Sequence, residues 1–156
     1  MMNDIKNNVP PGNTPAVLFV CVHNSGRSQM AEAIFNHLAE GKAQAFAAGT
    51  RPAAHTDRTV RQAMDEIGID ISGQRPKLLT PEMIESTGRI ISMGCGAAET
   101  CPVKLVPAEE WQIDDPEGKA IEEVRAIRDD IMASVLHLMA AASQKNNGER
   151  LPLTQK

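Results

Sequence analysis

The chain has 156 residues, which suits one domain with a single hydrophobic core. It carries 16 Lys and Arg residues against 20 Asp and Glu residues, and this net charge of −4 gives no electrostatic reason to expect nucleic acid as a partner. No apolar run is long enough to span a bilayer and the polar start lacks a signal-peptide hydrophobic region, so we expect a cytoplasmic protein without membrane attachment.

Residues 1–15, with prolines and a glycine among asparagines, predict a flexible leader. The pattern then alternates strands and helices, which predicts one catalytic α/β domain over residues 16–142 with a parallel sheet covered by helices on both faces. A polar tail is expected at 143–156. The expected strands are 16–20, 43–47 and 89–93. The expected helices are 29–40, a helix from the N-cap Thr56 to Ile67, a helix near 80–86 opened by Pro81, and a long helix from Pro116 or Glu117 to about Ala142.

The loop between the first strand and the first helix carries the strongest chemical signal. Its residues, here called the oxyanion loop, are Cys21, Val22, His23, Asn24, Ser25, Gly26, Arg27 and Ser28. Free backbone N–H groups at a helix start bind oxyanions, and a cysteine facing them is favoured as its thiolate. Arg27 offers a fork of donors to two oxygens, and Ser28 either caps the helix or donates to the sulfur. The loop predicts a nucleophile in an oxyanion site, the alternative being an inert buried cysteine.

A second cysteine pair, Cys95 and Cys101, follows the strand at 89–93. The carboxyl ends of parallel strands share one sheet edge, so we expect both to lie near Cys21. In a helix, residues six apart would be separated by ~9 Å along the axis, whereas a disulfide needs Cα atoms within about 7 Å. A Cys95–Cys101 bond therefore requires a loop. A zinc site is the alternative, although no fourth ligand is evident.

A carboxylic acid is needed to protonate the oxygen that leaves an attacked oxyanion. The segment 111–116 contains two candidates, Asp114 and Asp115, just before the long helix. We choose Asp115 because the rigid ring of Pro116 would fix its position. The alternative is an ordinary acidic pair favoured by the helix dipole.

Four motifs together resemble one family. They are CVHNSGRSQMAEA at 21–33, AAGT at 47–50, MGCGAAETCP at 93–102 and WQIDDPEG at 111–118. They resemble the thioredoxin-coupled arsenate reductases, which share the low-molecular-weight protein tyrosine phosphatase fold. The resemblance implies a four-stranded parallel sheet and arsenate bound in the oxyanion loop, which phosphate or sulfate would also fit.

The resemblance further implies a relay of disulfides. Cys21 would attack arsenic while Asp115 protonates the departing hydroxide, and Cys95 would then attack the Cys21 sulfur and release arsenite. Cys101 would attack Cys95 in turn, leaving a Cys95–Cys101 disulfide for thioredoxin. Phosphatase relatives generally lack this downstream cysteine pair.

Two departures from the family pattern leave questions open. Some relatives bind potassium beneath the loop; here Asn24 and Glu32 match, but the other two positions are Ala47 and Lys77. We hypothesise that the Lys77 ammonium replaces the ion and pairs with Glu32, and we expect no metal or other cofactor. The Cys95–Cys101 spacing leaves the reductant open between thioredoxin, mycothiol and glutaredoxin. The alternatives to a reductase are a phosphatase with a Cys21 phosphoenzyme and a non-enzymatic sensor of arsenite or metal.

Overall fold

A computed structural model describes residues 16–94 and 108–150 of the chain, with side chains as far as residue 141. The expected leader at 1–15, the two cysteines Cys95 and Cys101, and residues 151–156 of the expected tail lie outside this range. Among the described residues, no helix combines the length and apolarity needed to cross a membrane.

Four parallel strands form one sheet in the order β2-β1-β3-β4. They are β1 (Ala16–Cys21), β2 (Gln44–Gly49), β3 (Arg89–Ser92) and β4 (Glu109–Glu110). The first three match the expected strands to within a few residues. The resemblance implied a fourth strand, but the sequence pattern did not place it, because two exposed glutamates have neither an apolar run nor an alternating pattern.

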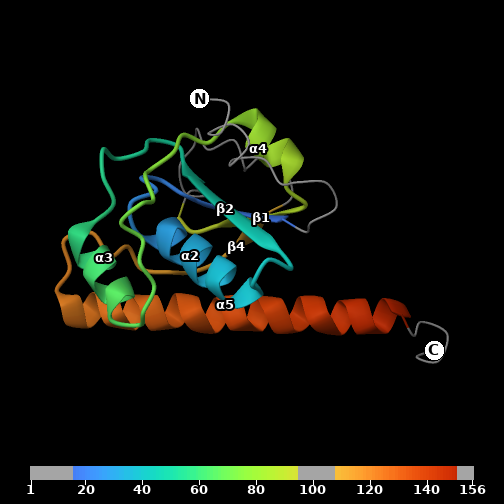
Figure 1. Ribbon diagram of the computed structural model, residues 1–156. Coiled ribbons are helices and arrows are strands. Elements are labelled where there is room, and N and C mark those ends of the chain that lie inside the picture. Colours follow the sequence, from blue (N-terminus) through green and yellow to red (C-terminus); the bar gives the residue numbers. More distant parts are fainter. Residues whose placement is uncertain (1–15, 95–107, 151–156) are drawn as a thin grey trace.

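Helices cover both faces of the sheet, as predicted (Figure 1). They are α2 (Arg27–Ala39), α3 (Arg58–Asp65), α4 (Pro81–Ser86) and α5 (Ile121–Arg150). Helices α2, α3 and α5 lie on one side, while α4 lies on the other. Successive strand residues therefore point into different cores: Phe19 and Ile91 pack with the larger helical layer, and Leu18 and Ile90 pack towards α4.

The predicted helix ends need three corrections. The N-cap of α3 is Asp57, whose carboxylate accepts from the Thr59 and Val60 amides, so the assignment of Thr56 was wrong. Helix α5 begins at Ile121, because residues 116–119 form a turn closed by the Lys119 amide on the Pro116 carbonyl. It continues to Arg150, so the end expected near Ala142 was also wrong.

The strand register decides where the loops meet. Cys21 pairs with Gly49, Val20 with Ser92, and Ser92 with Glu110. All four strands therefore end at the same edge of the sheet. The segments that follow them, from residues 22, 50, 93 and 111, start side by side at this edge, where ligands of parallel sheets bind.

Candidate active site

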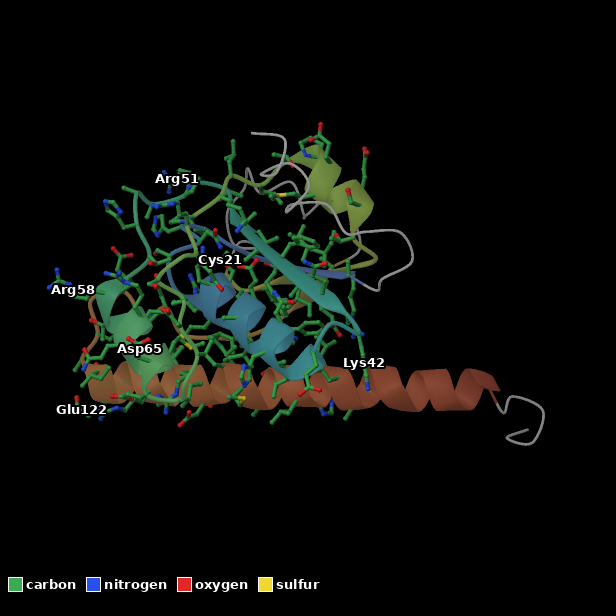
Figure 2. The ribbon with its side chains drawn as sticks, in the orientation of Figure 1. Cys21, Lys42, Arg51, Arg58, Asp65 and Glu122 are labelled. Atoms are coloured by element: carbon green, nitrogen blue, oxygen red, sulfur yellow. The ribbon has the colours of Figure 1, made fainter. Side chains whose placement is uncertain are left out.

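Cys21 ends β1 and is almost fully buried, close to the start of α2 (Figure 2). Its sulfur lies 2.9 Å from the Ser28 hydroxyl oxygen. The same hydroxyl oxygen accepts a hydrogen bond from the Asn24 side-chain amide at 2.5 Å. An amide nitrogen only donates, so the one hydroxyl hydrogen of Ser28 is left to point at the Cys21 sulfur. Ser28 thus supports a thiolate. Gly26, not Ser28, occupies the N-cap position of α2.

Asn24 holds the bend of the oxyanion loop from within. It is fully buried and adopts the left-handed conformation with φ of 52°, which asparagine tolerates better than most residues. Its side-chain oxygen accepts from the Lys77 amide at 2.8 Å and from the Gln29 side chain at 3.0 Å. Gln29, also fully buried, further donates to the Asn24 and Arg75 carbonyls. Segment 75–77 therefore supports the loop from below.

The chain leaving β2 supports the loop from one side. The Arg51 amide donates to the Val22 carbonyl and the Ala53 amide donates to the His23 carbonyl, both at 2.9 Å. Gly49 is pressed so closely against this stretch that an added Cβ would lie 2.5 Å from the Val22 carbonyl oxygen. The Val22 and His23 carbonyls are thus both occupied by amides of the segment that follows β2.

The Arg27 guanidinium is held between two other segments. Its Nη1 donates to the Ile113 carbonyl at 3.2 Å, and its side chain is only 12% exposed. An added Cβ at Gly94 would lie 2.6 Å from the same Nη1, and Gly94 has a φ of +95°. Gly94 directly precedes Cys95. The residue leading into the second cysteine segment therefore lies against the oxyanion-loop arginine.

Asp115, rather than Asp114, is the carboxylate that faces Arg27. Its Oδ2 lies 3.7 Å from Arg27 Nη2, and its Oδ1 accepts the Glu117 amide at 3.0 Å. Oδ1 already accepts an N–H, which leaves Oδ2 as the carboxylate oxygen turned to Arg27 and the oxyanion loop. Residues 111–118, here called the acid loop, also contact Gly26: an added Cβ there would lie 2.7 Å from Pro116 Cγ.

Glu32 and Lys77 pair as hypothesised, with Lys77 Nζ 3.9 Å from Glu32 Oε1. Burial raises the pKa of Glu32 to about 7, while the Lys77 ammonium acts in the opposite direction. Glu32 Oε1 is buried and accepts no hydrogen bond within the described part of the chain. A potassium ion does not fit this donor set, since Ala47 offers no side-chain oxygen and Lys77 brings a positive charge to the position.

The structure brings together the oxyanion loop, Asp115, and the pair of Glu32 and Lys77, while Cys95 and Cys101 lie outside the described residues. Sequence reasoning missed Gln29, the Ile113 carbonyl and Gly94 as parts of the site. Gln29 had a signal, since its polar side chain directly follows the oxyanion loop at the start of the predicted helix. The Ile113 carbonyl and Gly94 had no such signal, because each contacts Arg27 from a different segment of the chain. Among residues 16–94 and 108–150, no three His, Cys, Asp or Glu side chains gather as a metal site would require.

Comparison with known proteins gives a consistent result. Residues 16–148 match the family model described as low molecular weight phosphotyrosine protein phosphatase. A putative arsenate reductase of Halobacterium salinarum is 37% identical over 125 residues, covering 77% of this chain and 87% of that one. A glutaredoxin arsenate reductase of Synechocystis sp. is 35% identical over 130 residues, covering 81% and 98%. The solved thioredoxin-dependent arsenate reductase of Corynebacterium glutamicum superposes with a TM-score of 0.73 at 32% identity, covering 87% of this chain and 65% of the longer chain.

Proposed function

Because the chain belongs to the low molecular weight phosphotyrosine protein phosphatase family, we infer that its oxyanion loop serves the reaction of its arsenate reductase relatives. The protein is an arsenate reductase, an oxidoreductase that converts arsenate to arsenite. The observation that carries this function is the Cys21 sulfur beneath the Ser28 hydroxyl, beside an arginine and a carboxylic acid. The same family resemblance supports the two further cysteines as its electron source.

The first step is nucleophilic attack. The Cys21 thiolate forms a sulfur–arsenic bond, and one arsenate hydroxyl leaves as water after taking the proton from Asp115 Oδ2. Loop amides and Arg27 hold the remaining oxygens, whose negative charge they stabilise. The Ser28 hydroxyl donates its hydrogen bond to this sulfur before the attack. The orientation of Asp115 and the Ser28 hydrogen bond support these roles.

The second step is the transfer of two electrons. The Cys95 thiolate attacks the Cys21 sulfur, the sulfur–arsenic bond breaks, and its electron pair remains on arsenic, which leaves as arsenite. Cys101 then attacks the Cys95 sulfur and releases the Cys21 thiolate, so that the oxidation ends as a Cys95–Cys101 disulfide. Gly94 beside Arg27 supports the closeness of this segment to the loop.

We propose thioredoxin as the reductant of the final disulfide, supported by the thioredoxin-dependent relative. Cytoplasm is the proposed location, because the relay needs thiols that return to the reduced state. We also propose that Lys77 stands in for potassium under the loop, as its ion pair with Glu32 suggests. Added potassium should then leave the rate of arsenate reduction unchanged, and a sharp rise would contradict this substitution.

A thiol count tests the reductase. Fully reduced protein with three thiols is exposed once to arsenate without any external reductant, and free thiols and arsenite are then measured. We expect two thiols to disappear for each arsenite formed, leaving one per chain. Three thiols with no arsenite would contradict the internal relay and favour a reductase that depends on an external thiol, or a phosphatase.

A Cys95→Ser variant separates the reductase from the phosphatase hypothesis. In a reductase, Cys95 supplies the electrons, so this variant should lose arsenate turnover. Hydrolysis of an aryl phosphate needs only Cys21, Arg27 and Asp115, so any such activity should persist in the variant. A phosphatase would show substantial aryl phosphate turnover in the wild type and no arsenite in either protein.

A further inference from the structure

A contact between a histidine and a glutamate joins the oxyanion loop to the acid loop, and the reaction steps above do not use it. His23 Nδ1 lies 3.6 Å from Glu117 Oε1, with side chains 43% and 66% exposed. His23 is fixed on its own side, because its carbonyl accepts the Ala53 amide at 2.9 Å. Glu117 belongs to the turn at 116–119, in which Gly118 takes a φ of +75°.

Glu117 is attached at both its backbone and its side chain. Its backbone amide donates to Asp115 Oδ1 at 3.0 Å, while its carboxylate faces His23. The Asp115 carboxyl is thus held by the Glu117 amide, and the side chain of the same glutamate reaches His23. A shift of residue 117 would therefore turn Oδ2 of Asp115 relative to Arg27 and to the bound oxyanion.

A purely structural role explains this pair poorly. Exposed ion pairs contribute little to folding, and a glutamate close to an anion site repels the substrate. The acid loop already has apolar and polar contacts that hold it in place, namely Pro116 against Gly26 and the Ile113 carbonyl on Arg27. These contacts hold residues 113 and 116, and none of them involves the Glu117 side chain.

We propose that His23 and Glu117 form a clasp that positions the proton donor Asp115 over the oxyanion loop. Both side chains act as positioning groups: they work through Asp115 and touch no reacting atom. The proposal rests on the proposed function, in which Asp115 protonates the departing hydroxide. It predicts that breaking the clasp slows the chemical step while substrate affinity is kept, because removing the glutamate charge does not weaken anion binding.

The test is single-turnover reduction of arsenate by fully reduced protein, with the rate followed over a range of arsenate concentrations. We expect Glu117→Ala and His23→Gln each to lower the maximal rate roughly three- to fivefold, the range that exposed ion pairs supply. Half-saturating arsenate should stay within about twofold. The double variant should be no slower than either single variant, because one contact is lost in each case. Glu117→Gln, which retains a hydrogen-bonding side chain, should recover part of the rate.

Two matched variants control for charge and for surface histidines. Glu122→Ala removes a glutamate from the first turn of α5, which lies well away from Cys21 (Figure 2). His55→Gln removes an exposed histidine outside the oxyanion loop. Both should react at the wild-type rate. Rates that multiply in the double variant, or a change confined to half-saturation, would overturn the clasp.

The outcome separates the clasp from the function on which it rests. If the wild type reduces arsenate and the variants match it, the clasp is wrong and the reductase stands. If the wild type forms no arsenite, the proposed reductase function is wrong. The clasp can then be tested by hydrolysis of aryl phosphates, because their leaving oxygen also needs a proton. Glu117→Ala should then slow phenyl phosphate more than p-nitrophenyl phosphate, whose leaving group depends less on an acid. Equal losses on both would overturn it.

Discussion

At the scale of single residues, Ser28 depends on Asn24 for its effect on the nucleophile. A serine hydroxyl has one hydrogen and could point it at either neighbour. The Asn24 amide occupies the oxygen lone pair and leaves the hydrogen for the sulfur. Asn24 is itself held by Gln29 and by the Lys77 amide. Residues as distant in the sequence as Lys77 therefore help to fix the direction of the Ser28 hydrogen bond to Cys21.

Replacing Ser28 by alanine should therefore weaken Cys21 as a nucleophile. Hydrogen bonds to charged groups contribute roughly 1.5–3 kcal/mol, which corresponds to a loss of at least about tenfold in reactivity near neutral pH. The measurement is alkylation of Cys21 by iodoacetamide in a Cys95→Ser, Cys101→Ser background. Ser72→Ala, in an exposed loop, should react like the parent. Equal rates for Ser28→Ala and the parent would show that the hydroxyl does not support the thiolate.

Glu32 makes stability depend on pH in a direction opposite to that of most carboxylates. Its pKa is raised to about 7 in the folded chain, against an ordinary value of 4.5, because its side chain is only 13% exposed. Between these two pH values the folded chain holds a proton that the unfolded chain has released. The contribution of Glu32 to stability is therefore complete below pH 4.5 and is lost as pH rises through about 7.

A Glu32→Gln variant should remove this dependence. Relative to the wild type, its free energy of unfolding should rise by about 2–3 kcal/mol between pH 5 and pH 8, from the shift in pKa at roughly 1.4 kcal/mol per unit. Urea unfolding of both proteins at the two pH values measures the difference, and the other titrating groups cancel in the comparison. A difference that stays constant with pH would mean that Glu32 is already ionised at pH 5.

At the scale of elements, capping residues were predictable where one candidate stood alone. Pro81 was expected to open a helix near 80–86, and the Thr80 hydroxyl before it accepts the Met83 amide as the cap of α4. At α3 the sequence analysis chose Thr56, whereas the next residue, Asp57, is the cap, and the N-cap preferences of threonine and aspartate differ too little to separate them. Strand β4 was beyond prediction, because two glutamates become a strand only by pairing with Ile91 and Ser92.

Helix α3 is joined to α5 through a capping contact from another element. Near the end of α3, the Gln62, Met64 and Asp65 carbonyls accept backbone amides that follow the helix. The Ala63 carbonyl instead accepts from Arg128 of α5 at 2.8 Å, and Arg128 is 9% exposed. No local sequence signal identifies this arginine, because its partner lies on a different helix.

An Arg128→Met variant should weaken the contact between α3 and α5 and so lower the free energy of unfolding. It keeps most of the buried stem but leaves the Ala63 carbonyl without its donor, which we expect to cost about 2 kcal/mol of unfolding free energy. Chemical denaturation measures the loss. Arg58→Met on α3, whose side chain extends away from the body in Figure 2, should change stability little. Equal stabilities of the two variants would show that water replaces Arg128 at the carbonyl.

At the scale of the whole molecule, the sequence predicted which residues do chemistry better than what surrounds them. Cys21, Arg27 and Ser28 share one loop, so their closeness followed from local order. Asp115 was predicted through the proline that follows it, and its contact with Arg27 agrees with that choice. The partners that shape the loop come from separate strand ends and interact through carbonyls, amides and glycines. These groups carry no side-chain pattern, so only the assembled sheet identifies them.

Gly49 shows how the sheet shapes the loop, and its replacement gives the last prediction. Gly49 ends β2 opposite Cys21, and an added Cβ would lie 2.5 Å from the Val22 carbonyl oxygen and 3.0 Å from Asn24. Both neighbours are backbone or fully buried, so the oxyanion loop itself must move in a Gly49→Ala variant. Titration calorimetry with inorganic phosphate should show affinity reduced by more than about tenfold, because the moved loop no longer holds its binding groups in place around the anion. Gly73→Ala, where an added Cβ meets no atom within 4 Å, should bind phosphate as the wild type does. Unchanged affinity in both variants would mean that the loop keeps its shape without support from β2.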